Sequence, residues 1–305
     1  MVILLAQYGP IIGGLVVAVI VTFVRRRTKV ELPPPVRLST AIALIVILAV
    51  FGYFSVWRVM PPVLPPLGED VFLMLQLAGY LAPVIAGGVG ALLLLVPRPV
   101  AGPTGTAALA PRTLTTFAPR SWLVGLVGAS AVAVLLAVVA GPASSPDDAG
   151  RYVQYEVRVA EHMTVGGSIY GWWFSVPTLI GIALLLGTVL IVIRMISSPA
   201  LGSDAAADTA VRVARVRSVL MVGTGALLLH LGEVMRSLSG TSTIRAGLPG
   251  GAAGWIELGT SFAALGPVLH WAAVGAVVLG FAMWWSVLFS ALPARSRQPG
   301  PAVAV

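Results

Sequence analysis

Seven apolar stretches, each long enough to form a helix across a lipid bilayer, dominate this sequence. A transmembrane helix needs about 20 mainly apolar residues. The stretches occupy approximately residues 2–24, 38–57, 71–96, 121–141, 171–195, 217–238 and 264–292. Hydrophobic residues make up 58% of the chain and charged residues only 10%, far fewer than in soluble domains. The sequence therefore predicts an all-α integral membrane protein, a single domain of seven transmembrane helices over residues 1–305.

Lysine and arginine residues are distributed unevenly between the two sides of these helices. The connections 25–37, 97–120, 194–217 and 293–305 hold five, three, four and two of them, which is 14 of the 19 in the chain. The alternate connections hold the remaining five. Because positive residues concentrate on the cytoplasmic side, the pattern predicts the N-terminus outside and the C-terminus in the cytoplasm. Basic clusters that flank apolar stretches report topology, so we expect no nucleic-acid partner.

The longest connection on the outer side, residues 142–170, has a strand-like pattern. Within residues 152–159 apolar and polar side chains alternate, which is the periodicity of a β-strand with one covered face. Gly166 and Gly167 follow soon after, as in a turn-rich hairpin. The sequence therefore predicts a small extracytoplasmic β-hairpin or flap over the outer mouth of the bundle.

Several classes of protein lack the residues that their chemistry needs. The chain has no cysteine, which excludes disulfides and thiolate metal sites. Lys29 is the only lysine, so the last span cannot form a retinal Schiff base. No serine-hydrolase, zinc-protease or phosphate-binding motif is present, and we expect a non-catalytic protein. Arginine in place of lysine, with abundant Ala, Val and Gly, is typical of a high-GC bacterial genome and indicates the bacterial cytoplasmic membrane.

Ionisable residues lie within the outer halves of the last two spans. His230, Glu233 and Arg236 are on the sixth span and His270 is on the seventh, at similar predicted depth. His162, in the outer loop, is on the same side. Polar groups in a membrane helix need partners. The cluster predicts an interhelical hydrogen-bond network, a haem or copper site at His230 and His270, or a pathway for a substrate, quinone or proton.

The third span carries a second set of polar and helix-breaking residues. Gln76 and Tyr80 precede Pro83, which is in the middle of the span. Proline removes a helical hydrogen bond and can kink a helix, and broken helices form binding sites in transporters. These three residues are therefore candidates for lining a path, although prolines also occur in rigid bundles.

Residues 203–217 predict a basic helix at the cytoplasmic face that continues into the sixth span. A capping residue and an alanine run precede Arg212 and Arg215, which are three positions apart. Such a helix can dock a cytoplasmic partner or simply form the positive flank of a long span.

Three functions remain open from the sequence. The first is a non-catalytic membrane subunit of a permease-type transport complex. The second is a subunit of a respiratory complex that binds haem, copper or quinone near the outer face. The third is a structural or assembly subunit without a ligand. All three place the chain in the lipid bilayer, and most of its mass lies there, which predicts other subunits as partners.

Overall fold

The computed structural model describes most of the chain. The described residues are 2–24, 30–59, 68–97, 116–160, 163–198, 204–249 and 255–293. Within them lie seven α-helices, which are α1 (Val2–Val24), α2 (Pro34–Val59), α3 (Glu69–Leu93), α4 (Arg120–Ala140), α5 (Trp172–Ser197), α6 (Ala205–Ser242) and α7 (Gly266–Ser290). A single 3-10 turn, Ala263–Leu265, leads into α7.

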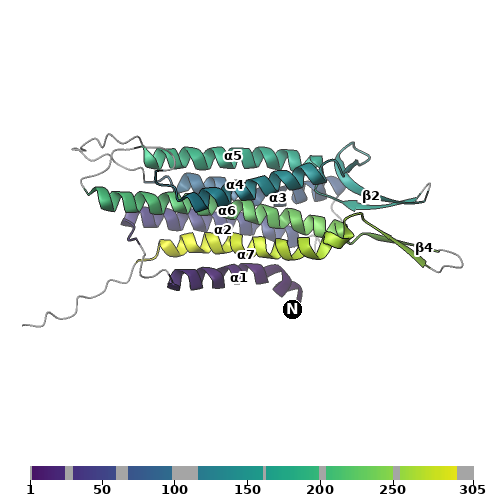
Figure 1. The fold of residues 1–305 in the computed structure, drawn as a ribbon, viewed down its shortest axis with the longest axis horizontal. Helices are drawn as coiled ribbons and strands as arrows, with labels where there is room; N and C mark the ends of the chain where they lie inside the picture. Colours follow the sequence, from purple (N-terminus) through teal and green to yellow (C-terminus); the bar gives the residue numbers. More distant parts are fainter. Residues whose placement is uncertain are drawn as a thin grey trace, which may run out of the picture.

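Six of these helices, α2 to α7, are long and apolar enough to cross a membrane. In α1 the side chains are described over Tyr8–Val24, a stretch that is also apolar but shorter. All seven helices run along the long axis of the molecule (Figure 1). The chain is therefore a mostly helical, multi-pass membrane protein with a small amount of β-structure.

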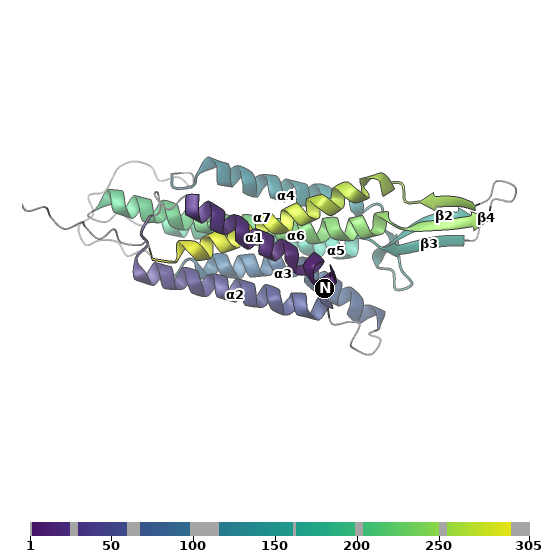
Figure 2. The same ribbon diagram turned by 90° about the horizontal axis from the view of Figure 1, so that it is seen from below.

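Helix α6 forms the centre of the bundle. It packs against α3, α4, α5 and α7, and 94% of its membrane-length segment is buried, compared with 28–44% for the other five candidate spans. Helix α1 lies outside, along α7, and α2 packs between α3 and α7 (Figures 1 and 2). The other helices expose apolar side chains, such as Val124 and Leu184 at 71% and 68%, on faces suited to lipid.

One continuous helix of 38 residues, Ala205–Ser242, covers residues 205–217 of the predicted basic helix and the predicted sixth span. The Asp204 carboxylate caps it by accepting a hydrogen bond from the Ala207 amide at 3.0 Å. A helix of this length measures about 57 Å, whereas the hydrocarbon core of a bilayer is about 30 Å thick. Part of α6 therefore extends beyond the apolar layer.

Helices α6 and α7 approach each other closely where they cross. A Cβ atom on Gly280 would lie 2.8 Å from the Leu229 Cγ atom and 2.9 Å from the Gly225 carbonyl oxygen. Nearby, the indole of Trp284 is fully buried and donates a hydrogen bond to the Val222 carbonyl at 3.1 Å. Glycine on both helices thus allows the two backbones to approach closely, and the Trp284 ring fills the space beside this contact.

Two small antiparallel sheets lie together at one end of the bundle (Figure 1). The first contains β1 (Ser145–Pro146), β2 (Tyr152–Ala160) and β3 (Met163–Ser168), and the alternating residues 152–159 lie in β2. The second pairs β4 (Arg245–Pro249) with β5 (Trp255–Gly259), which the sequence did not predict. The sheets contact each other between β2 and the end of β5, where the Tyr155 and Ser261 hydroxyls are 3.1 Å apart.

Candidate functional site

His230 lies inside the bundle, on the central helix. Its side chain is fully buried, and its Nδ1 atom is 3.0 Å from the backbone carbonyl oxygen of Tyr80 in α3. Because a carbonyl oxygen can only accept, Nδ1 carries the proton and donates this hydrogen bond. The other ring nitrogen, Nε2, is also buried and has no hydrogen-bond partner among the described residues. In the neutral ring Nε2 therefore presents a lone pair to the interior of the protein.

A line of polar groups leads from the sheet end of the bundle to this histidine. The Gln76 amide nitrogen lies 3.2 Å from the Ser168 hydroxyl in β3 and 3.2 Å from the Tyr80 hydroxyl. Tyr80 thus connects to Gln76 through its side chain and to His230 through its backbone carbonyl. We call Ser168, Gln76, Tyr80 and His230 the polar line.

The Ser168 end of the polar line opens into a cavity of about 310 Å³ between the start of α3 and the first sheet. Ser168 lines this cavity, together with Glu69 from α3 and Gln154, Glu156 and Thr164 from the strands. Phe72, Leu73 and Val153 also line the cavity, so its walls are part polar and part apolar, and the polar part can hold water or a polar solute. The polar line therefore joins a partly polar surface cavity to a buried imidazole.

Aromatic rings enclose the inner part of the polar line. The Tyr80 ring makes edge contacts with Tyr170 and Phe174, with centroids 4.9 and 5.4 Å apart, and Tyr170 also packs on the His230 ring at 6.1 Å. The hydroxyls of Tyr170 and Thr178 are hydrogen-bonded to each other. These rings are almost fully buried and shield the imidazole from lipid.

The structure unites residues that the sequence placed in two separate groups. Gln76 and Tyr80 were candidates for lining a path, and His230 belonged to the ionisable cluster of the last spans. Pro83 is also buried in α3, one turn beyond Tyr80. It cannot donate the usual helical hydrogen bond to the Gly79 carbonyl, which adjoins the carbonyl that His230 uses. Sequence alone could not connect the two groups because hydropathy does not identify helix neighbours.

His270 does not join His230. Its side chain is exposed on α7 and lies beside the exposed ring of Trp271, with centroids 5.4 Å apart. The structure therefore does not bring together the two histidines of the predicted haem or copper site. The first turns of α7 are exposed on several sides, and Val268 is 65% exposed.

The geometry of the remaining predicted residues also bears on a metal or haem site. Glu233 is buried one turn beyond His230, and its carboxylate lies 3.8 Å from the half-exposed guanidinium of Arg236. His162 lies outside the described residues. No three His, Asp or Glu side chains in the described part of the chain are grouped so that they could hold a metal ion. The described members of the cluster contribute the hydrogen bond of His230 and the ion pair of Glu233 with Arg236.

Arg212 and Arg215 are buried, with exposures of 2% and 6%. Arg212 pairs with Asp208 at 2.7 Å and points toward the carbonyls at the end of α5. Arg215 donates to three carbonyls at the end of α3, those of Leu94, Leu95 and Pro97. The structure therefore does not present these two side chains on its surface for the predicted docking of a partner. They bind the carbonyls that helix ends leave without internal partners.

Comparison of the chain with protein-family models, curated proteins and solved structures found no significant match.

An ion-pair network attaches the first sheet to the helices. The Arg151 side chain lies 2.7 Å from Asp147 and 2.5 Å from Asp70 at the start of α3, and its guanidinium is 5.9 Å from the centre of the Trp173 ring in α5. The Asp147 carboxylate also accepts from the backbone amides of Ala149 and Arg151. This network fixes the sheet over the outer end of the polar line.

The Asp147 network predicts an acid-sensitive sheet. Burial on its own would raise the pKa of Asp147, but the hydrogen bonds and charge of Arg151 hold that pKa below its usual value of 3.8. A lowered pKa stabilises the fold above the unfolded value, and the contribution is lost as the pH falls through the lowered value. Amide exchange over residues 145–155, corrected for its intrinsic pH dependence, should therefore accelerate between about pH 5 and about pH 2.

Asp147→Asn should accelerate this exchange at the higher pH and remove most of its acid dependence. The matched control is Asp148→Asn, at the exposed neighbouring position, which should leave the profile unchanged. Identical acid profiles for the two variants would contradict the assignment to Asp147.

Proposed function

We propose that the chain is a non-catalytic membrane subunit of a permease-type transport system in the bacterial cytoplasmic membrane. It has seven spans in this proposal, with α1 as the first, the N-terminus outside and the C-terminus in the cytoplasm. The placement of 14 of the 19 lysines and arginines supports this orientation. The two sheets are then extracytoplasmic, at the end of the bundle where α1 begins (Figure 1).

The observation that carries the proposal is the polar line. It runs from a partly polar cavity beside the sheets to a fully buried imidazole whose Nε2 atom has no hydrogen-bond partner among the described residues. A polar group buried in a membrane protein without a partner is costly, and such groups mark substrate or ion pathways when they adjoin a cavity. The line is thus suited to bind a small hydrogen-bond donor in the outer half of the membrane, because the free lone pair of Nε2 can accept from it.

The rest of the architecture supports a subunit that relies on a partner or an ion gradient for energy. Outside the bundle the described residues form only two small sheets, and the sequence has no phosphate-binding loop. Neither feature supplies a means of nucleotide hydrolysis. We therefore expect the chain to work with another subunit, docked through surfaces other than the buried Arg212 and Arg215.

The same geometry favours transport over a redox function. A haem or copper site built on His230 and His270 needs two imidazoles that face a common centre. His230 uses Nδ1 to bind the Tyr80 carbonyl, and His270 is exposed on α7. This pair does not fit a bis-histidine site.

The test is purification of the tagged chain in mild detergent, followed by mass spectrometry and an activity assay in vesicles. We expect an ATP-hydrolysing subunit in fixed ratio. In His230→Phe the aromatic ring is kept but its hydrogen bond is lost. The rate of ATP hydrolysis by the complex in vesicles should then fall about tenfold, which corresponds to one hydrogen bond of about 1.4 kcal/mol. His270→Phe is the matched control and should keep the full rate.

A chain that purifies alone and binds stoichiometric haem would refute the proposal. So would equal rates for the two variants, because the polar line would then have no part in the activity. If His230→Phe lowers only the unfolding temperature and not the rate, the histidine is a structural residue.

A further inference from the structure

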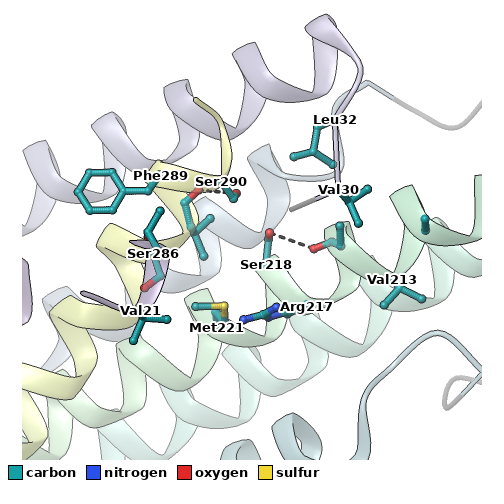
Figure 3. A pocket seen from close by; sticks show the side chains of 14 residues that line it. Val21, Val30, Leu32, Val213, Arg217, Ser218, Met221, Ser286, Phe289 and Ser290 are labelled. Atoms are coloured by element: carbon teal, nitrogen blue, oxygen red, sulfur yellow. Dashed lines mark hydrogen bonds between the residues drawn. The ribbon is translucent and has the colours of Figure 1, made fainter. Parts of the chain in front are cut away.

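A second cavity, of about 430 Å³, lies between α1, α6 and α7 at the end of the bundle away from the sheets (Figure 3). It is far from the polar line and from the first cavity. Its volume is in the range of sites that bind small molecules, about 300–1,000 Å³. It arises because α1 packs mainly against α7, which leaves the neighbouring stretch of α6 uncovered.

Two rows of side chains on α6 form one wall of the cavity. Ala210, Ala214 and Ser218 are spaced by four residues and share a helical face. Their short side chains leave the space open. The adjacent row contains Val213, Arg217 and Met221, also four apart, so a single cation lies between two apolar side chains.

The opposite wall is mainly apolar and includes hydroxyl groups. Val21 from α1 and Leu32 from the segment before α2 contribute apolar surface, and Ser286 and Ser290 come from the end of α7 (Figure 3). The Ser290 hydroxyl donates to the Val287 carbonyl in its own helix at 2.6 Å, and its oxygen can still accept a hydrogen bond. An amphipathic ligand would find an apolar slot with polar groups beside it.

Arg217 gives the cavity its charge preference. Its guanidinium carbon lies 5.5 Å from the centre of the Trp122 ring in α4, a position that orients the planar group. Guanidinium remains charged at all physiological pH values and binds phosphate groups well. The connections at this end of the bundle also carry most of the positive charge of the sequence.

We propose that this cavity binds one phospholipid with an anionic head group. An acyl chain occupies the apolar slot between α1, α6 and α7, and the phosphate lies beside Arg217. The mainly apolar lining favours an apolar chain, and the positive charge of the arginine favours an anion over a neutral or zwitterionic head group. Anionic lipids are also the class that positive charge at a membrane face attracts.

The test compares retention of two lipids by the purified full chain, measured by native mass spectrometry. The lipids are phosphatidylglycerol and phosphatidylcholine with the same acyl chains. We expect a single retained phosphatidylglycerol and much weaker retention of phosphatidylcholine. Arg217→Gln should reduce phosphatidylglycerol retention roughly fivefold, the expected effect of one cation near a membrane surface.

Two variants separate the head-group contact from the slot and from general charge. Arg236→Gln removes a half-exposed arginine at the opposite end of the same helix and should keep full retention. Ala214→Leu fills the slot, keeps every charge and should reduce retention of both lipids. If Arg217→Gln does not fold, Ala214→Leu still tests whether a lipid occupies the cavity.

Four results would overturn the proposal. The first is an intact chain that retains no lipid, and the second is equal retention of the two lipids. The third is equal loss of phosphatidylglycerol in Arg217→Gln and Arg236→Gln. The fourth is full retention in Ala214→Leu.

Discussion

Replacing Arg215 by methionine should lower the free energy of unfolding by about 3 kcal/mol, one of the two largest effects that we expect from a single substitution. One guanidinium nitrogen of Arg215 lies 2.9–3.0 Å from the carbonyl oxygens of Leu94, Leu95 and Pro97. These carbonyls follow the last turn of α3, so no backbone amide further along the helix is available to donate a hydrogen bond to them. Methionine fills a similar volume but leaves them without their donor at a buried site.

Thermal unfolding in detergent, followed by loss of the monodisperse protein peak, measures this effect. Arg215→Lys should recover part of the stability, because one ammonium group can reach some of the carbonyls but lacks the planar fork. Arg158→Met is the control at an exposed arginine in β2 and should change the free energy of unfolding by at most about 0.5 kcal/mol. Equal unfolding temperatures for Arg215→Met and Arg158→Met would show that the three hydrogen bonds do not stabilise the fold.

Gly280→Ala should destabilise the protein by about 2 kcal/mol because it separates α6 from α7. The added methyl would meet the Gly225 carbonyl oxygen at 2.9 Å and the Leu229 side chain at 2.8 Å. Leu229 is almost fully buried and Gly225 presents backbone, so neither can move aside. Relief of the clash has to shift a whole helix and would disturb the packing of Trp284.

Gly275→Ala on the same helix is the matched control. No atom lies within 4 Å of the position that its methyl would take, so alanine there adds helix propensity without a clash. We expect Gly275→Ala to be neutral or to stabilise the fold by up to about 1 kcal/mol. The same thermal assay applies, and Gly280→Ala unfolding no earlier than Gly275→Ala would contradict the close approach.

The fold class was predictable because it depends on local properties. Apolar length and the scarcity of charge are sufficient to predict a helical multi-pass protein, and the described helices α2 to α7 agree with that class. Alternation over residues 152–159 likewise located β2. The arrangement of the helices was not predictable, since apolar stretches of similar composition can pack in many orders. Nothing in the hydropathy of α6 identified it as the helix that the others surround.

The site was predictable only in part, for the same reason. The sequence indicated Gln76, Tyr80 and His230 as polar residues in apolar helices, but their connection depends on α3 and α6 being neighbours. Positive residues before a span report the side of the membrane without reporting which way each side chain points. Arg212 and Arg215 therefore matched the pattern of a cytoplasmic flank although they bind internal carbonyls.

The central position of α6 imposes an order on biosynthesis. Its charged and polar groups make α6 unstable as a single helix in lipid. Helices α3, α4 and α5, which pack against it, precede it in the chain and can be in the membrane before α6 is synthesised. Among the described helices α7 follows α6, and α7 is also the main neighbour of α1. Helix α1 therefore gains its main packing surface only after α7 has been synthesised.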